Sequence, residues 1–422
     1  MEAKKTFTTN LGGRELTVIF KDLSPRANGA LLVKYGETVI MATAVMGAEK
    51  NIDFFPLTVE YEEKFYAAGK IIGSRFIRRE GRPSDEAILS GRLIDRIIRP
   101  LFDQDLRREI QIITTVLAFD EENDPDCLAI IAASLALGIS DIPWAGPAAG
   151  VRITENENGL VINSKISETK DSKFETFVAG TENRINMIEF GGSDINESRA
   201  LQAFELAQKE INNLIEFQNT IIKEIGKEKI TIAKKIENEE LKNKIDEYLK
   251  NKLEEAMFAP KKSGDKSPLN ILKYDLKKHL KESGFESNLS EAENIFENYV
   301  NDLLHEKILN EEKRPDGRKL DEVRELKSEV SLFERTHGSA LFKRGDTHAL
   351  AITTLAAPGQ EQMIETMQST GTRRFLLHYN FPPYSVGEIK PMRGPGRREI
   401  GHGALALKAI KPLLPSRDEF PY

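Results

Sequence analysis

The chain has 422 residues, of which 40% are hydrophobic and 30% charged, and its formal net charge is −7. This length exceeds one ordinary hydrophobic core and predicts two or three domains of a globular protein. The single cysteine, Cys127, excludes a disulfide framework and fits a reducing, cytoplasmic setting. A signal-peptide pattern is absent, and the longest apolar run, 127–139, is too short to span a bilayer.

Residues 1–197 predict a domain of mixed strands and helices. Short alternating or apolar runs separated by glycine turns are typical of strands, and longer apolar runs indicate helices. The expected strands are 16–20, 30–33, 39–45 and 110–118, and the expected helices are 89–98 and 127–137. Because strands and helices do not alternate regularly, the pattern favours an α+β fold.

Residues 198–312 predict an all-helical domain. Leucine or isoleucine recurs every four residues at Leu241, Ile245, Leu249 and Leu253, which marks one buried helix face. Ser290 and Glu293 have the spacing of a capping box and predict the start of a further helix. The many charges of this region indicate solvated surface rather than a binding site.

Residues 313–422 repeat a pattern of the first domain. The motif Arg26-x-x-Gly-x-x-Leu-x-Lys-x-Gly-x-Thr-x-x-x-Ala42 returns without a gap at Arg335–Ala351, and Arg78-Arg79-Glu80 returns as Arg397-Arg398-Glu399. Such a distant repeat predicts two copies of one fold, with Arg79 and Arg398 in comparable loops. The second copy stops soon after Lys411-Pro412, the counterpart of Arg99-Pro100, so we expect the chain to end inside its second domain.

Basic residues gather at matching places in the two copies. Between Gly73 and Arg108 there are nine arginines and six acidic residues. Arg92, Arg96 and Arg99 share one face of the expected helix 89–98. By itself this pattern is an amphipathic helix with solvated arginines. The arginines upstream favour an RNA or phosphate ligand instead, because clustered guanidinium groups bind phosphates through paired hydrogen bonds. These upstream residues are Arg75, Arg78, Arg79 and Arg82.

The second basic segment, 394–403, contains four glycines beside Arg397, Arg398 and His402. Glycine lets a ligand approach the backbone closely, although an exposed structural loop would look the same. Aromatic residues in 373–384 either stack on bases or belong to a strand that ends at Pro382-Pro383; for Phe375 and Phe381 we favour the strand. No metal site is predicted, because His337 and His348 lack a third ligand.

Several motifs together resemble the bacterial polynucleotide phosphorylase family. They are Arg314–Arg318 (RPDGR), Phe333–Leu341 (FERTHGSAL), His378–Glu388 (HYNFPPYSVGE), Arg397–Gly403 (RREIGHG), Phe76–Arg82 (FIRREGR) and Arg92–Phe102 (RLIDRIIRPLF). The resemblance covers the whole chain. It implies two RNase PH-like domains joined by an all-helical domain, the second one truncated, with borders at 1–197, 198–312 and 313–422. It also implies a homotrimer that threads single-stranded RNA through a pore.

The activity implied is 3′-to-5′ exoribonucleolytic phosphorolysis to nucleoside diphosphates, the reaction of a polyribonucleotide nucleotidyltransferase in mRNA degradation, and its reversal. Inorganic phosphate is then a co-substrate and Mg²⁺ a cofactor. The resemblance places Arg78, Arg79 and Arg82 at the RNA-holding pore loop. It assigns Arg397, Arg398 and His402 to the active-site segment of the second domain. Arg92, Arg96 and Arg99 match further RNA-binding positions of the first domain.

The family's phosphate-binding serines, its metal-binding aspartates and its KH and OB-type RNA-binding domains are expected beyond Tyr422. The first copy offers only Glu168, Asp171 and Glu175, which form no convincing pair of carboxylates. The polypeptide alone is therefore expected to be inactive, as a piece of an enzyme that works within an RNA-degradation complex. The alternative is a non-catalytic RNA-binding or assembly module of the same fold.

Overall fold

The computed structural model describes residues 4–21, 23–52, 54–73, 78–169, 172–232, 238–260 and 267–422. The chain forms two compact units, one made of residues 1–232 and 357–422 and the other of residues 233–356. Within the described ranges, no helix has the length and apolar character needed to cross a membrane.

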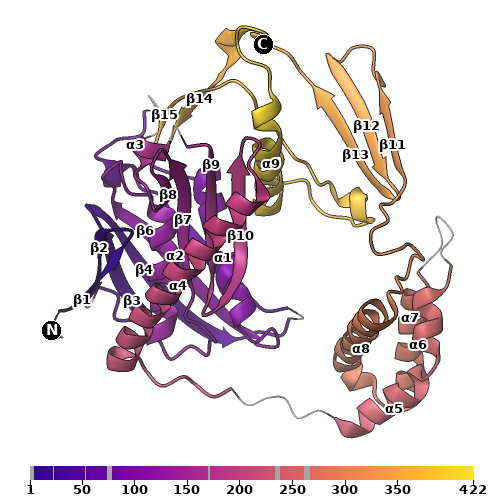
Figure 1. The fold of residues 1–422 in the computed structure, drawn as a ribbon. Helices are drawn as coiled ribbons and strands as arrows, with labels where there is room; N and C mark the ends of the chain where they lie inside the picture. The colour runs from indigo at the N-terminus through magenta and orange to yellow at the C-terminus, as the bar shows by residue number, and fades with distance from the viewer. Residues whose placement is uncertain are drawn as a thin grey trace. The chain divides into compact units, whose positions relative to one another are not determined.

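Two sheets form the framework of the first unit (Figure 1). Its strands are β1 (Lys5–Leu11), β2 (Arg14–Phe20), β3 (Gly29–Tyr35), β4 (Thr38–Glu49), β5 (Leu57–Glu62), β6 (Arg108–Ala118), β7 (Ala149–Asn156), β8 (Gly159–Ile162), β9 (Phe174–Thr181) and β10 (Arg184–Gly192). One sheet has the order β1-β2-β3-β4-β6-β5, in which β5 runs parallel to β6. The other has the antiparallel order β10-β9-β7-β8. The mixture of sheets and helices confirms the α+β prediction.

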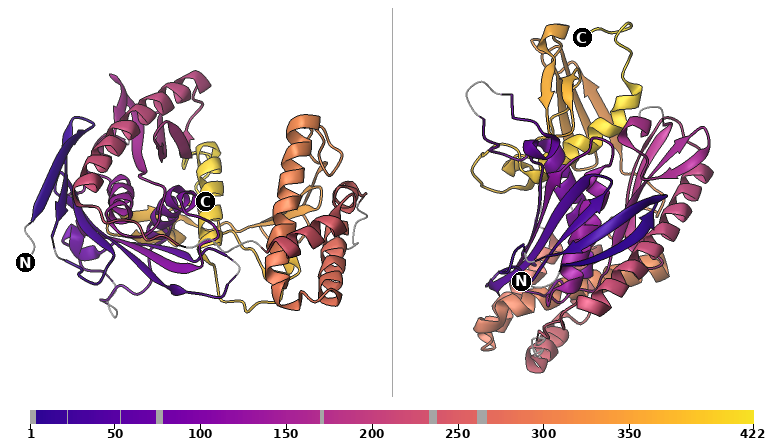
Figure 2. Two further views of the ribbon diagram at one scale, coloured as in Figure 1. Left: turned by 90° about the horizontal axis from the view of Figure 1, so that it is seen from below. Right: turned by 90° about the vertical axis from the view of Figure 1, so that its left-hand side faces the viewer.

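Helix α2 (Pro125–Ile139) lies between the two sheets, as the views in Figure 2 show. It packs on β3 and β4 on one side and on β7 on the other. Asp124 caps its first turn by accepting the Asp126 N–H at 2.8 Å. A helix covered on both sides must be apolar all round, which is why the run 127–137 shows no polar face.

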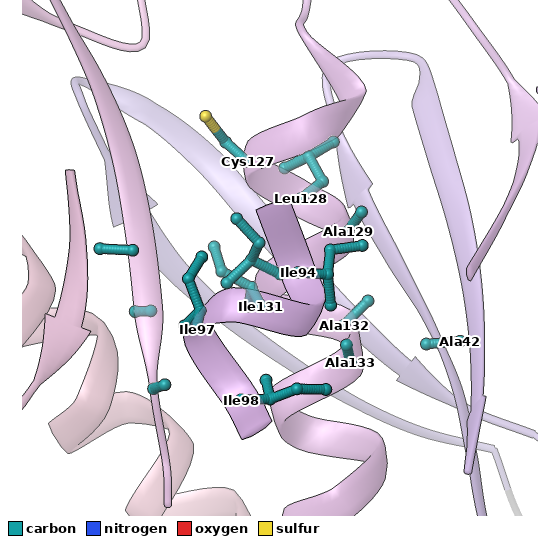
Figure 3. Close-up of a cluster of buried hydrophobic side chains, with 14 of the residues drawn as sticks. Ala42, Ile94, Ile97, Ile98, Cys127, Leu128, Ala129, Ile131, Ala132 and Ala133 are labelled. Carbon is teal, nitrogen blue, oxygen red and sulfur yellow. The ribbon is translucent and has the colours of Figure 1, made fainter. Parts of the chain in front are cut away.

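Helix α1 (Asp85–Ile98) completes this core. Ile94, Ile97 and Ile98 point toward α2 in the close-up of Figure 3, and all three are buried. Full burial of each such side chain contributes roughly 1.5–3 kcal/mol to folding. Helix α4 (Glu197–Ile225) adds Ala203, Ala207 and Ile211 to the same core. The helical region that begins near residue 198 therefore starts with a helix that packs on the first domain.

Residues 357–422 add a hairpin and a helix to the first unit. The hairpin pairs β14 (Gln362–Glu365) with β15 (Thr370–Arg373), and helix α9 (Arg397–Ile410) packs on α1. The short elements of this unit are η1 (Phe65–Ala68), η2 (Arg99–Leu101), α3 (Ile166–Thr169), η4 (Pro358–Gln360), η5 (Pro383–Val386) and η6 (Lys411–Leu413).

The second unit contains the helical region. Its helices are α5 (Glu239–Leu249), α6 (Lys252–Phe258), α7 (Pro268–Glu282), η3 (Glu286–Asn288) and α8 (Leu289–Glu311). The predicted stripe of Leu241, Ile245, Leu249 and Leu253 is buried in their common core. The predicted capping box is wrong. Helix α8 begins at Leu289, before Ser290, and the carboxylate of Glu293 pairs with lysines of α7 instead.

A three-stranded sheet follows in the second unit, made of β11 (Leu326–Val330), β12 (Gly338–Arg344) and β13 (Thr347–Thr353). The repeated Gly-x-Thr motif forms equivalent turns, because Gly36 joins β3 to β4 and Gly345 joins β12 to β13, with φ values of 60° and 57°. The strand pairing predicted from the repeat is thus present in both copies. The three domain borders remain predictions.

The other half of the repeat does not correspond in space. Arg78 and Arg79 precede α1 in a loop, whereas Arg397 and Arg398 form the first turn of α9. The expectation of comparable loops is therefore wrong. The equivalent positions are Arg99-Pro100 and Lys411-Pro412, each of which opens a 3₁₀ turn at the end of its helix. For aligning the two copies, a shared pair of arginines is therefore less informative than a shared proline at the end of a helix.

Candidate nucleic-acid interface

Helix α1 presents two arginines on the side away from its isoleucine core. Ser84 begins the helix by accepting the Ala87 N–H at 3.0 Å. Leu93 and Ile97, four residues apart, are buried on one face of the helix. On another face Arg92 is half-buried and Arg96 is exposed. Neither arginine pairs with a carboxylate among the described residues. Both guanidinium groups keep their full capacity for an anionic ligand.

Helix α9 reaches α1 because it carries glycine at the point of contact. A Cβ built on Gly401 would lie 2.5 Å from Arg92 Nε, and one on Gly403 would lie 3.1 Å from the Leu377 carbonyl oxygen. A larger residue at Gly401 would displace the Arg92 side chain, and one at Gly403 would push α9 away from the 374–380 segment. At Gly401 and Gly403 the close neighbours are protein segments, and the expected approach of a ligand stays a prediction.

A hollow of about 180 Å³ lies between α1, α9 and β10. Its polar wall carries Arg92, Arg96 and Lys408, and its floor is apolar. Lys408 is neutralised by Glu189, whose Oε1 lies 2.8 Å from its Nζ. The two arginines give the hollow a positive surplus beside an apolar surface, which suits a phosphate group attached to a larger body. The hollow is lined by Leu89, Arg92, Leu93, Arg96, Met187, Glu189, Gly401, Ala404, Leu405 and Lys408.

Two of the predicted site arginines are held by the protein itself. Arg99 Nη2 lies 2.6 Å from Asp95 Oδ1 and 3.0 Å from the Leu57 carbonyl oxygen. Arg397 donates to the Val59 carbonyl oxygen at 2.7 Å and pairs with Glu60. Both side chains fasten helices to β5, so their charge is already matched within the fold. Their RNA-binding and active-site roles remain predictions.

Arg398 and His402 stand beside aromatic rings. The guanidinium carbon of Arg398 lies 4.5 Å from the centroid of Phe381, a cation–π distance. The rings of His402 and Tyr379 are 5.1 Å apart. Tyr379 and Phe381 are almost parallel, with 10° between their planes. The structure therefore joins the predicted basic segment and the predicted aromatic segment into one cluster, next to the hollow.

The arginine loop, defined as the described residues 78–84, precedes α1. Arg79 and Arg82 are exposed, and Arg78 Nη1 donates to the Ile72 carbonyl oxygen at 2.9 Å. Arg75 lies outside the described residues. Both ends of the loop are ordered by the fold, since Glu80 accepts the Phe65 N–H at 2.7 Å and Ser84 caps α1.

The described residues do not fit a magnesium site. No group of three His, Cys, Asp or Glu side chains is close enough to hold a metal in the described part of the chain. Glu175 pairs with the partly buried Arg152, and Glu168 accepts the Lys165 N–H at 3.3 Å. Asp171 lies outside the described residues. No chemical step is therefore assigned to a metal held by these residues.

Some participants were not found by sequence reasoning. Lys408, Glu189 and Glu60 take part in the site through ion pairs between residues far apart in the chain. Tyr379 was noted only as part of an aromatic run. Nothing in the local sequence indicates these pairings, although the spacing of Lys408 places it on the same face of α9 as Gly401 and Leu405.

Comparison with protein families decides the classification. A model described as "3' exoribonuclease family, domain 1" matches residues 12–143 and 322–422. This chain belongs to the 3′ exoribonuclease family. A second model, described as "Polyribonucleotide nucleotidyltransferase, RNA binding domain", matches residues 240–319 and therefore covers the helical region. The two-copy architecture with a helical region between the copies is confirmed.

Curated relatives agree with the resemblance seen in the motifs. The chain is 45% identical over 420 residues to a polyribonucleotide nucleotidyltransferase of Caldicellulosiruptor saccharolyticus, covering 99% of this chain and 60% of that one. It is 46% identical over 425 residues to one of Thermomicrobium roseum, covering 98% and 53%. The chain thus spans little more than half the length of these relatives. A crystal structure of rice Rrp46 is similar with a TM-score of 0.41 at 14% identity, covering 50% of this chain and 96% of that one.

Proposed function

We propose that this chain forms the RNA-binding part of a phosphorolytic 3′-to-5′ exoribonuclease that degrades mRNA. In this reaction an oxygen of inorganic phosphate bonds to the terminal phosphorus of single-stranded RNA. The bond from that phosphorus to the 3′ oxygen of the preceding nucleotide breaks, and a nucleoside diphosphate leaves. A homotrimer in the cytoplasm, a magnesium requirement and membership of an RNA-degradation complex belong to the same proposal.

One structural observation supports the proposal most directly. Arg92 and Arg96 face α9 without a carboxylate partner among the described residues, while neighbouring Arg99, Arg397 and Lys408 are all paired. Free cations beside paired ones indicate a place for an external anion. A phosphodiester backbone supplies that anion, and the rings of Tyr379 and Phe381 offer a surface for a base.

Each group has a positioning role in this proposal. Arg78, Arg79 and Arg82 bind phosphates of incoming RNA at the arginine loop. Arg92 and Arg96, with Arg398 and His402, hold the 3′ end in the orientation that attack in line with the leaving oxygen requires. Orientation of this kind supplies a large part of a reaction barrier without any covalent chemistry by the protein.

The test is phosphate-dependent release of ADP from poly(A) by the complete protein in the presence of magnesium ions. Arg92→Ala with Arg96→Ala is expected to lower kcat/KM at least ten-fold, which corresponds to about 1.4 kcal/mol of transition-state binding. Lys209→Ala, an exposed change on α4, is the control. RNA binding without any ADP release would favour the non-catalytic module. Unchanged kcat/KM in the double variant would contradict the assignment of the site.

A further inference from the structure

The tip of the β14–β15 hairpin is inserted into the core of the first half of the chain. Met367 at the tip has no exposed surface and belongs to the first unit's hydrophobic core. The Thr366 N–H donates to the Ser369 carbonyl oxygen at 2.8 Å and closes the turn. Lys70 Nζ donates to the Met367 carbonyl oxygen at 3.1 Å. The tip is thus held at a defined place.

That place is the peptide between Ile72 and Gly73, whose carbonyl oxygen accepts a hydrogen bond from Arg78 Nη1 of the arginine loop at 2.9 Å. The Gly73 N–H donates to Glu365 Oε1 at 2.7 Å. A Cβ built on Gly73 would lie 2.5 Å from the same oxygen, so a larger residue would displace the Glu365 carboxylate. A hydrogen bond to a charged acceptor is stronger than a neutral one, and here it fixes the peptide that also binds Arg78.

The same tip also reaches the end of the loop. Gln368 Nε2 lies 3.4 Å from Glu63 Oε1, and the other oxygen of Glu63 accepts the Ser84 hydroxyl at 2.7 Å. Ser84 is the residue that caps α1. Burial raises the pKa of Glu63. Close by, Arg373 of β15 pairs with Glu86 of α1 at 2.9 Å.

We propose that the hairpin tip is the positioning element of the arginine loop, so that residues of the second copy set the RNA affinity of the first. Glu365 holds the Ile72–Gly73 peptide to which Arg78 donates, and Gln368 holds Ser84, at the end of the loop, through Glu63. Neither side chain contacts RNA. They act by keeping Arg78, Arg79 and Arg82 in one arrangement, which spares RNA the entropy cost of ordering the loop. This inference rests on the proposed RNA-binding role of the loop.

Glu365→Ala in the complete protein tests the inference. The expected result is about ten-fold weaker binding of a single-stranded poly(A) oligonucleotide, as for loss of roughly 1.4 kcal/mol, and a matching rise in KM. At saturating RNA, kcat and the melting temperature stay within experimental error of the parent. Glu365→Gln keeps an acceptor oxygen for Gly73 and should restore most of the affinity. Met363→Ala, exposed on the same hairpin, is the matched control.

Gly73→Ala gives a second route to the same contact, because the added methyl group displaces the Glu365 carboxylate. The two changes should not be additive, since each removes one shared interaction. Additive losses, or an affinity unchanged in Glu365→Ala, would overturn the inference. So would equal losses of affinity, kcat and melting temperature, which indicate general destabilisation. Arg78→Ala with Arg79→Ala distinguishes failure of this inference from failure of the proposed RNA-binding role of the loop. If that variant binds RNA normally, the proposed role of the loop is wrong as well.

Discussion

The backbone of Gly401 on α9 lies against the side chain of Arg92 on α1, so closely that a Cβ on Gly401 would come within 2.5 Å of Arg92 Nε. This contact joins the two copies of the repeat at the hollow that carries the unpaired arginines. The glycine is therefore retained inside a helix, where it costs about 1 kcal/mol relative to alanine.

Gly401→Ala is predicted to weaken RNA binding without lowering the stability of the fold. Alanine improves the helix by up to about 1 kcal/mol, but its methyl group forces Arg92 out of its position. We expect RNA affinity to fall several-fold while the melting temperature stays level or rises, measured by fluorescence anisotropy and by calorimetry. Gly359→Ala is the control, because a Cβ there meets no atom within 4 Å. Equal affinities for the two variants would show that Arg92 does not bind RNA.

Arg78→Ala with Arg79→Ala is predicted to make RNA binding less dependent on salt. Each lost phosphate contact should reduce the slope of log affinity against log salt by about 0.7 for a single strand. The slope is obtained from titrations at four or more salt concentrations. Lys209→Ala with Lys223→Ala removes the same charge from the exposed face of α4 and should leave the slope unchanged. A parent-like slope in the arginine variant would identify both arginines as solvated surface.

Asp126 is predicted to make the fold less stable as the pH rises toward neutrality. Burial, and then the neighbouring Asp124, raise its pKa to about 7, while Arg152 opposes this shift. The folded state thus binds a proton more tightly than the unfolded chain, where the pKa is about 3.9. Stability from this group is full below about pH 4 and declines up to about pH 7.

Asp126→Asn should remove this decline, because the amide stays uncharged at every pH. Urea unfolding at pH 5.5 and pH 8 measures the difference, and the parent should lose on the order of 1–3 kcal/mol more than the variant between these values. An identical pH dependence in both proteins would mean that another group titrates in this range.

Lys229→Met is predicted to destabilise the first unit. The Lys229 ammonium donates to the carbonyl oxygens of Leu137, Gly138 and Ser140 at 2.7, 3.0 and 2.7 Å. These groups lie at the C-terminal end of α2, where a positive charge is favourable. Methionine fills similar space without donors, and we expect a loss of roughly 1–3 kcal/mol in urea unfolding. Lys223→Met, exposed on α4, should change stability by less than about 0.5 kcal/mol.

Local pattern was sufficient to predict most elements of this protein. The predominantly apolar run at 127–137 predicted a buried helix, and the leucine stripe beginning at Leu241 predicted the core of the helical region. The repeated Gly-x-Thr turn predicted the same strand pairing in both copies. Each of these features depends on residues a few positions apart, whose periodicity determines which side of an element is buried. The family motifs of the site can be recognised from the sequence for the same reason, because each is a short stretch of neighbouring residues.

Only the tertiary structure decided which charges of the site are free. In sequence, Arg92 and Arg99 look alike, yet Arg99 is held by Asp95 and by the Leu57 carbonyl oxygen of β5, whereas Arg92 lies against Gly401. The insertion of Met367 into the core of the first half was equally invisible. The reason is physical: a charge is neutralised by an opposite charge within about 4 Å of it. Asp95 lies four residues from Arg99, but Glu60 and Glu189 lie 337 and 219 residues from Arg397 and Lys408 along the chain. The sequence by itself determined the elements and the basic residues, and long-range packing selected the arginines that remain available to a ligand.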